Sequence, residues 1–246
     1  MIDILFTDAD LLAINKPPGL SVHEAPGPGS SVMRELREQG EADLTPVHRL
    51  DKDASGVLLF ARSKKVAGAL QKNWDKVEKR YQALCAGIPP EESGTIDAPI
   101  LEHQTGKPER LENALKYFRK ENPGVELPPI PAPKTSAVHP AGRSSQTAYR
   151  VLEAFDSPAG KFAWLEVRPQ QGRMHQIRVH LAHIGCTLAL DRLYGKAASD
   201  FPPLARMPLH AAVLKIEWPV GSGKALEINA PLPNDLAATL TALRAK

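Results

Sequence analysis

Eight short runs of β-branched, aromatic and other apolar residues are spread along the chain, and most follow one another with no helix between them. Runs of this length, bounded by turn-forming residues, predict strands. We therefore expect an α+β fold built on a mostly antiparallel or mixed central sheet, flanked by helices and loops. The runs are residues 2–6, 11–15, 57–62, 80–86, 146–155, 162–168, 210–218 and 225–229.

Apolar residues three and four positions apart predict three helices. The first covers residues 64–79, the second runs from near Gly172 to a stop at Gly185, and the third covers about 234–244 with Asn234 as its N-cap. Six prolines between Pro123 and Pro140 predict a surface excursion at about 104–145 that holds one short helix near 110–119. With no internal repeat or linker, we expect residues 1–246 to form one domain.

The beginning of the chain is acidic, and no apolar run approaches the roughly 20 residues that span a bilayer. The two cysteines, Cys85 and Cys186, lie far apart in the sequence, which argues against a secreted disulfide scaffold. We expect a cytoplasmic protein that does not insert into a membrane. The net charge of +3, from 31 basic and 28 acidic residues, does not by itself indicate a polyanionic partner.

The first segment that could carry catalytic or binding residues is residues 46–60, PVHRLDKDASGVLLF. In it, a turn-rich connection leads into an apolar strand. Asp51 is the candidate for catalysis. A glycosidase-like pair of Asp51 with Asp53 is disfavoured, because neither carboxyl shows an apolar pocket that would keep it protonated. The alternative is that Asp51 caps a turn while His48 and Arg49 are solvated loop residues.

The second segment is residues 167–185, VRPQQGRMHQIRVHLAHIG, where Arg178 lies at the margin of the apolar stripe of a helix. A guanidinium at the edge of a core needs an anionic partner. Arg173 and His175 open the same helix, where backbone donors favour a phosphate. The histidines lack zinc-ligand spacing, so we expect no metal.

The third segment, residues 77–87, leads Lys79, Arg80 and Tyr81 into a strand. A strand tyrosine is commonly half-buried with a hydrated hydroxyl, whereas in a cleft its ring could stack on a base.

Taken together, these segments resemble the RluA-type family of RNA pseudouridine synthases. HRLD at 48–51, followed by Ala54, Ser55 and Gly56, is similar to the catalytic loop of that family. NKPPGL at 15–20, KRYQAL at 79–84, GRMHQIRVHLAHIG at 172–185 and LHAAVL at 209–214 follow in the family's order. Three departures are Ala54 where threonine is usual, Leu190 where glycine commonly precedes Asp191, and the long insertion at about 104–145. We expect no S4-type RNA-binding domain ahead of Ile2.

The resemblance implies that Asp51 is the catalytic carboxylate, that Tyr81 packs on the target uracil and takes part in removing the C5 proton, and that Arg178 pairs with Asp51. It implies a cofactor-free and metal-free isomerase, monomeric, that acts on a flipped-out uridine of a ribosomal or transfer RNA stem-loop, with neither DNA nor a membrane as partner. Arg49 is the candidate to fill the vacated stack. The expected RNA contacts are His48, Arg49, Lys79, Arg80, Arg173 and His175.

Basic residues of one region support RNA binding by their local excess, although an exposed lysine is usually only solvated. They are Arg62, Lys64, Lys65, Lys72, Lys76, Lys79 and Arg80, with Arg143, Arg150 and Arg173 as an extension. The alternative function is a catalytically silent RNA-binding protein of the same fold, which would not need the set of Asp51, Tyr81 and Arg178. A zinc-dependent base deaminase is excluded because Cys85 and Cys186 are isolated from each other in sequence.

Overall fold

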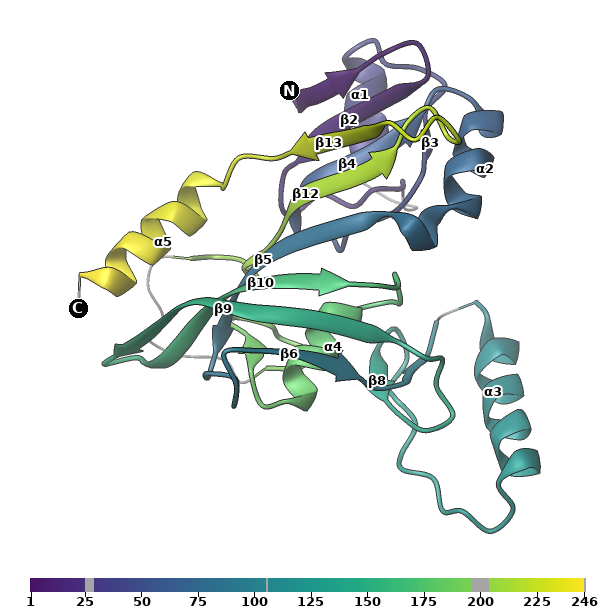
Figure 1. The fold of residues 1–246 in the computed structure, drawn as a ribbon, viewed down its shortest axis with the longest axis vertical. Coiled ribbons are helices and arrows are strands. Elements are labelled where there is room, and N and C mark those ends of the chain that lie inside the picture. The colour runs from purple at the N-terminus through teal and green to yellow at the C-terminus, as the bar shows by residue number, and fades with distance from the viewer. Residues whose placement is uncertain (25–28, 105, 196–203, 246) are drawn as a thin grey trace. The chain divides into compact units, whose positions relative to one another are not determined.

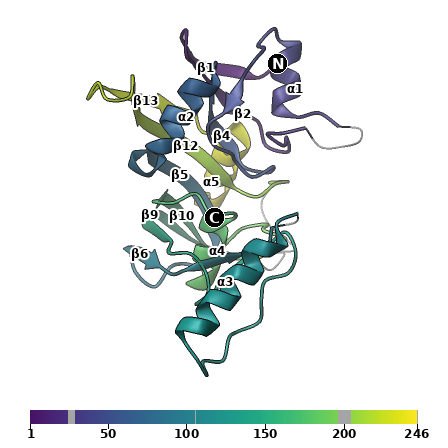
Figure 2. The ribbon, with the colours of Figure 1, turned by 90° about the vertical axis from the view of Figure 1, so that its right-hand side faces the viewer.

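A computed structural model describes residues 1–24, 29–104, 106–195 and 204–245. The chain forms two compact units: Met1–Ala83 with Asp200–Lys246, and Leu84–Ser199. Each unit is described by itself (Figure 1, Figure 2). The expectation of one catalytic domain over residues 1–246 stays a prediction. None of the helices in the described ranges has the length and apolar character needed to cross a bilayer.

The first unit contains a mixed sheet in the order β1-β2-β4-β12-β5, with β13 beside β12 and β3 beside β4. Its neighbouring strands are antiparallel, apart from β4 and β12, which are parallel. This arrangement confirms the α+β class with a mixed sheet. The strands are β1 (Asp3–Thr7), β2 (Leu11–Lys16), β3 (Thr45–Pro46), β4 (Ser55–Ala61), β12 (Leu209–Glu217), β13 (Ala225–Asn229) and β5 (Glu78–Ala86), whose last three residues belong to the second unit.

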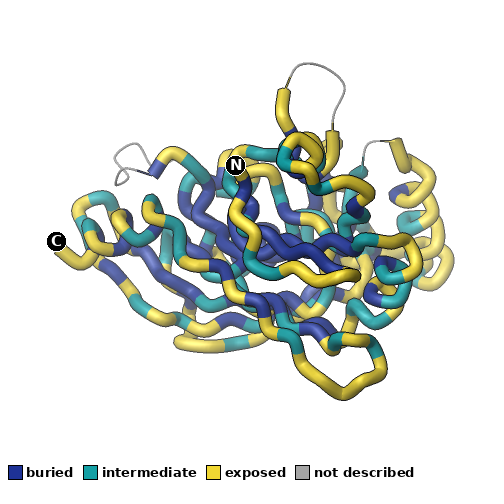
Figure 3. Tube along the Cα trace, turned by 90° about the horizontal axis from the view of Figure 1, so that it is seen from above, coloured by how far each residue is buried: buried dark blue, intermediate teal, exposed yellow. Residues whose placement is uncertain are grey.

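Strand β4 is the centre of the first unit, because all seven of its residues are buried. Val57, Leu59 and Ala61 point to one face of the sheet and pack in a cluster with Leu70 of α2 (Lys64–Lys72). A continuous apolar run is typical of a strand that is covered on both faces. Figure 3 shows the buried residues gathered along the strands and the exposed ones on the connections.

The helix predicted over residues 64–79 is wrong in its second half. Helix α2 begins after Ser63, whose Oγ accepts a hydrogen bond from the Val66 N–H at 3.2 Å. It ends at Asn73, whose side-chain amide donates to the Ala69 carbonyl at 3.0 Å and so competes with a further helical turn. A 3₁₀ turn, η1 (Trp74–Lys76), follows, and Lys79 lies in β5.

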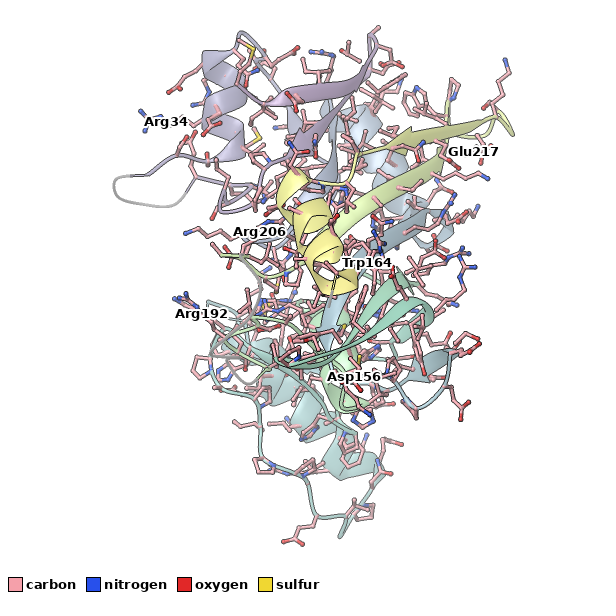
Figure 4. The ribbon with its side chains drawn as sticks, turned by 90° about the vertical axis from the view of Figure 1, so that its left-hand side faces the viewer. Arg34, Asp156, Trp164, Arg192, Arg206 and Glu217 are labelled. Atoms are coloured by element: carbon pink, nitrogen blue, oxygen red, sulfur yellow. The ribbon has the colours of Figure 1, made fainter. Side chains whose placement is uncertain are left out.

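Helix α5 (Asn234–Arg244) has the predicted bounds, but Pro233 rather than Asn234 occupies its N-cap position. Arg206 fixes the first turn through Asp235: Nε and Nη2 donate to the two carboxylate oxygens at 2.6 and 2.9 Å. Figure 4 shows Arg206 beside this helix. Helix α1 (Val32–Glu38), capped by Ser31, has no counterpart among the helices predicted from the sequence.

The second unit is built on the long hairpin of β9 (Gln146–Ser157) and β10 (Gly160–Pro169), with β6 (Ser93–Asp97) on the outer edge of β9. The end of β5 pairs with β11 (Thr187–Leu188). Helix α4 (Gln176–His183) is shorter than predicted, because residues 172–175 form a turn and His175 has a left-handed backbone with φ 58°.

The proline-rich insertion at 104–145 is more ordered than predicted. Its helix, α3 (Pro108–Glu121), extends beyond the expected range at both ends, and β8 (Ser136–Val138) pairs with β7 (Ile100–Glu102) in a separate two-stranded sheet. The prediction of one surface excursion overlooked β8, because a run of three residues carries no readable periodicity.

Gly56→Ala is expected to lower the free energy of unfolding by about 3 kcal/mol or more, since overpacking and backbone strain each cost about 1 to 3 kcal/mol. Gly56 has φ +109°, and a Cβ at this position would overlap the Ala211 carbonyl oxygen on the neighbouring strand. Urea titration measures the effect. Gly68→Ala is the control, because Gly68 lies within α2 with open space at its Cβ position and should gain up to about 1 kcal/mol. Equal stability of the two variants would contradict the expectation.

Candidate functional site

The candidate catalytic residue, Asp51, lies in a tight turn immediately before β4. The Ala54 N–H donates to the Asp51 carbonyl at 3.1 Å, and the Asp51 side chain is half-buried while Arg49 and Asp53 on either side are exposed. Buried Leu50 holds the turn against the core. The turn therefore presents one carboxylate partly out of water, with an exposed guanidinium two residues before it.

Lys16, at the end of β2, fixes the shape of this turn from inside the protein. Its side chain is completely buried, and its ammonium donates to the carbonyls of Pro17, Lys52 and Ala54 at 2.8, 2.9 and 2.7 Å. Three carbonyls use all three donors of the ammonium. Two of these carbonyls belong to the Asp51 turn, so its backbone cannot move without breaking a buried hydrogen bond to a charged group.

Burial lowers the pKa of Lys16 to about 8, although the carboxylates of Asp53 and Asp51 favour its charged form. The ammonium and the Asp51 carboxylate thus attract each other within the first unit. The sequence analysis matched Lys16 only as part of NKPPGL and gave it no role, because a lysine at the end of a strand usually reaches solvent.

Tyr81 on β5 is brought toward this turn by strand register. Tyr81 is opposite Ala211 on β12, and Ala211 is opposite Gly56 on β4, five residues after Asp51. Burial, and then the nearby Asp51 carboxylate, raises the pKa of the Tyr81 phenol above its usual range. The first unit therefore places a neutral phenol and a carboxylate within electrostatic reach of each other, and the roles of both in catalysis stay predictions.

A second support of the β4 start is His210, which the sequence analysis also left without a role. Ser55 Oγ donates to Nδ1 of His210 at 3.0 Å, and Nε2 donates to the Ala230 carbonyl at 3.3 Å. Burial lowers the pKa of His210, so the ring stays neutral and can accept from Ser55. A side chain of β12, His210, thus holds Ser55, and the backbone of β12 holds Gly56.

His48 and Lys79, two of the expected RNA contacts, pack around Trp74. The His48 ring stacks on Trp74 with centroids 4.9 Å apart, and its Nε2 accepts from the Leu59 N–H at 3.1 Å. Burial, followed by the nearby Lys79 ammonium, lowers the pKa of His48 to about 3. Lys79 is buried with its ammonium 5.9 Å from the Trp74 ring. Both side chains thus pack inside the first unit, and their contact with RNA stays a prediction.

Arg80, another expected RNA contact, is held between two carboxylates. Its guanidinium lies 2.9 Å from Glu78 and 3.0 Å from Glu227 on β13. Its contact with RNA also stays a prediction. To bind a phosphate, Arg80 would have to keep both carboxylates as partners or replace one of them with the phosphate.

In the second unit, Arg178 of α4 has a buried anionic partner, Asp191. The Arg178 Nε and Nη2 donate to the two Asp191 carboxylate oxygens at 2.7 and 2.8 Å, and the guanidinium lies 5.1 Å from the Tyr194 ring. Burial alone would raise the pKa of Asp191, but Arg178 and the backbone N–H groups of Leu193 and Tyr194 hold it below its usual range. The bidentate pair locks the direction of the guanidinium.

Leu190 explains one departure from the family pattern. It has φ 59°, the left-handed conformation that glycine adopts without cost. The turn that delivers Asp191 to Arg178 therefore keeps the backbone shape that a glycine commonly supplies, at the expense of strain at a leucine.

The turn before α4 is fixed by two contacts that the sequence analysis overlooked. Tyr194 Oη lies 2.9 Å from His175 Nδ1 and accepts from the Ser136 N–H at 2.8 Å. Glu102 of β7 accepts from the Met174 N–H at 2.6 Å. His175 is thus oriented by Tyr194.

Arg173 lies in the same turn close to a second arginine, Arg143. Burial and the like charge of Arg143 lower the pKa of Arg173, while Glu102, which pairs with Arg143, favours its charge. The Arg173 Nη2 donates to the Ser144 carbonyl at 3.3 Å. The structure therefore places Arg173 and His175 in the turn before α4, whereas Arg178 lies inside the helix, buried and paired with Asp191. Contact of Arg173 and His175 with RNA stays a prediction.

The free energy of unfolding of the wild-type protein, relative to that of Lys16→Met, is expected to rise between about pH 8 and about pH 10.4. In this window the unfolded lysine, with a pKa of about 10.4, binds more protons than folded Lys16, so raising the pH favours the folded state. Urea titrations at several pH values test this. The control is Lys52→Met: this lysine of the same turn is exposed, so its substitution should change the free energy of unfolding by no more than about 0.5 kcal/mol. A pH-independent difference for Lys16→Met would contradict the lowered pKa.

Comparison with known proteins gives a consistent picture. Residues 10–183 match a family model described as RNA pseudouridylate synthase. The chain is 39% identical over 240 residues to an uncharacterized RNA pseudouridine synthase of Chloroflexus aurantiacus, covering 94% of this chain and 66% of that protein. It is 32% identical to the ribosomal large subunit pseudouridine synthase D of Haemophilus influenzae, covering 99% and 71%. The chain thus spans about two thirds of the length of these relatives.

Among solved structures, the fold is similar to human RNA pseudouridylate synthase domain containing 1, with a TM-score of 0.69 at 23% identity, covering 100% of this chain and 96% of that one. The resemblance to RluA-type enzymes is confirmed by these matches. The chain belongs to the RNA pseudouridylate synthase family, and the protein is an RNA pseudouridine synthase, an isomerase.

Proposed function

We propose that the protein isomerises specific uridines of ribosomal RNA to pseudouridine and that Asp51 is the catalytic carboxylate. Relatives named as ribosomal large subunit pseudouridine synthases C and D, 34% and 32% identical, support ribosomal over transfer RNA as the substrate. The observation that carries the proposal is the Asp51 turn itself: the Lys16 ammonium holds the backbone of the turn, and the turn presents a half-buried carboxylate within electrostatic reach of Tyr81.

The reaction explains why an ionised carboxylate is required. Pseudouridine formation breaks the N1–C1′ bond of the uridine, turns the uracil and forms a C5–C1′ bond, after which C5 loses its proton and N1 gains one. Asp51 acts as a carboxylate whether it adds to the sugar or takes a proton from it. The neighbouring Lys16 ammonium attracts that negative charge, and its three carbonyl bonds fix where the carboxylate stands.

Tyr81 has two proposed tasks. Its ring packs on the target uracil, since aromatic faces accept any base. Its hydroxyl stays protonated because of its raised pKa, so it acts in the removal of the C5 proton as a relay that accepts one proton while passing another to a nearby acceptor such as Asp51.

Arg178 is proposed as the third member of the catalytic set, by the resemblance alone. Asp191 uses the Nε and Nη2 edge of the guanidinium. Asp191 therefore fixes the plane of the guanidinium.

The target uridine is proposed to flip out of its stem-loop at a cost of about a few kcal/mol. Arg49, exposed two residues before Asp51, is placed to enter the vacated stack, because a planar guanidinium can stack and bind phosphate. Arg173 and His175 are proposed to bind the RNA backbone. Their turn joins the N-terminus of α4, where backbone N–H groups favour an anion.

We further propose a cytoplasmic monomer. Cys85 and Cys186 are both buried free thiols, which suits a reducing compartment. The substrate class supports the same compartment.

Asp51→Asn is expected to lower pseudouridine formation by about 10⁴-fold or more while RNA affinity stays within about threefold of the wild type, because the amide has the same shape but cannot act as a carboxylate. Single-turnover assays and filter binding on the same ribosomal RNA transcript measure both quantities. Asp53→Asn, an exposed carboxylate two residues away, should keep its turnover. Substantial turnover by Asp51→Asn would remove Asp51 from the chemistry.

Arg178 is expected to contact Asp51 with charge-assisted hydrogen bonds of about 2.7 to 2.9 Å. A crystal structure of the enzyme bound to an RNA with 5-fluorouridine at the target position would measure the distance. Separation of the two side chains in that closed complex would defeat the pairing.

Tyr81→Phe and Tyr81→Leu separate the two tasks of Tyr81. Phenylalanine keeps the ring, so RNA binding should stay near normal, whereas leucine should weaken it by about fivefold or more, since stacking contributes about 1 to 3 kcal/mol per base. Loss of the hydroxyl should slow tritium release from uridine labelled at C5, because that step is the proton transfer. Full-rate release by Tyr81→Phe would exclude the relay, and normal binding and turnover by Tyr81→Leu would place Tyr81 outside the site.

A further inference from the structure

A pocket of about 680 Å³ lies within the second unit between α3 of the insertion, β7 and the turn at residues 140–143. Ligand sites commonly have volumes of about 300 to 1,000 Å³. Gly142 forms part of the pocket wall where the turn meets the backbone of Ile100 so closely that a Cβ would overlap it. The pocket therefore has a rigid side, made by the turn and β7, and a side made by one helix.

Helix α3 presents a single stripe of residues to this pocket. Arg110, Asn113, Ala114, Tyr117 and Phe118 all line it, at the spacing of three and four that puts side chains on one helix face. Tyr117 is 68% exposed, and in the described ranges it is the one aromatic among the strongly exposed large apolar side chains. An exposed aromatic ring beside a pocket is a surface on which a planar group can stack.

A basic residue lines each side of the pocket. Arg110 is exposed on the helix side, and Arg143 is exposed on the turn side. The acidic lining residue, Glu102, is engaged by Arg143 and by the Met174 N–H. Arg143 is thus paired with a carboxylate, whereas no ion pair engages Arg110 within the described residues. The Arg110 guanidinium, the Tyr117 ring and the Asn113 amide make a set that recognises an unpaired nucleotide through its phosphate, its base face and its base edge.

The pocket is also joined to the turn that precedes α4. Glu102 contacts Arg143 at the pocket and Met174 in the turn, next to Arg173. The two arginines lie close enough for the charge of Arg143 to lower the pKa of Arg173. Arg173 and Arg143 thus lie near each other, so an RNA strand that meets the turn before α4 can also reach the pocket.

We propose that this pocket binds an unpaired nucleotide of the substrate RNA at a distance from the target uridine, with the base stacked on Tyr117 and the phosphate on Arg110. The proposal rests on the proposed function, because it takes RNA as the substrate. It assigns RNA recognition to the insertion that departs from the family pattern.

The experiment measures RNA affinity rather than turnover. Arg110→Ala and Tyr117→Ala are compared with the wild type by filter binding to a ribosomal RNA transcript at fixed salt. Both residues are exposed, so the substitutions should not affect folding. Each is expected to weaken binding by about fivefold or more, the scale of a lost base stack or phosphate contact, and Tyr117→Phe should restore most of the affinity.

Arg119→Ala is the matched control. Arg119 is an exposed arginine of the same helix that does not line the pocket, so its substitution removes the same charge and should change affinity by less than about twofold. Equal losses for Arg110→Ala and Arg119→Ala would overturn the proposal in favour of general electrostatic attraction. Wild-type affinity in both pocket variants would also overturn it and favour a protein as the occupant of this face.

The outcome is independent of catalysis. Pocket-dependent RNA binding by a protein that forms no pseudouridine would reject the proposed function and keep the pocket. Pseudouridine formation with RNA affinity insensitive to Arg110 and Tyr117 would do the reverse.

Discussion

The buried ammonium of Lys16 is the constraint on which the first unit's chemistry depends. Burying a charge is costly unless its hydrogen bonds are satisfied, and here all three donors meet carbonyls. Two of the carbonyls lie on either side of Asp53, in the turn that begins at Asp51. The cost of burying the lysine is thus offset only when the turn has its native shape, so the position of the Asp51 carboxylate, the candidate for catalysis, is coupled to the stability of the core.

The second unit also buries a charged group with its hydrogen bonds satisfied, but here the group is an anion. Asp191 is a buried carboxylate that accepts from Arg178 and from two backbone N–H groups. Because its oxygens are fully engaged, it holds the arginine without leaving unsatisfied charge. The left-handed backbone at Leu190 costs about 1 to 2 kcal/mol. That cost is borne where the turn must deliver a carboxylate, which is where strain is commonly stored in enzymes.

Sequence patterns predicted the parts of the fold that repeat with a period. The strand at residues 225–229 and the helix at 234–244 match β13 and α5, since several residues of each share one packing face. The motifs also pointed to Asp51 and Tyr81 as candidate site residues, and their roles stay predictions. The buried roles of Lys16 and Lys79 were not, because the charge of a lysine predicts exposure, and only tertiary contacts with carbonyls or with a tryptophan reverse that expectation.

Burial and pairing also change how basic residues should be counted. The sequence suggests a positive region from Arg62 to Arg80, yet Arg62 pairs with Glu41 at 2.8 Å and Arg80 with Glu78. A guanidinium already neutralised by a carboxylate contributes little to a field that attracts RNA. The exposed basic residues, such as Arg49 and the lysines of α2, contribute more to such a field, while Lys16 and Arg178 are held in fixed positions by buried hydrogen bonds.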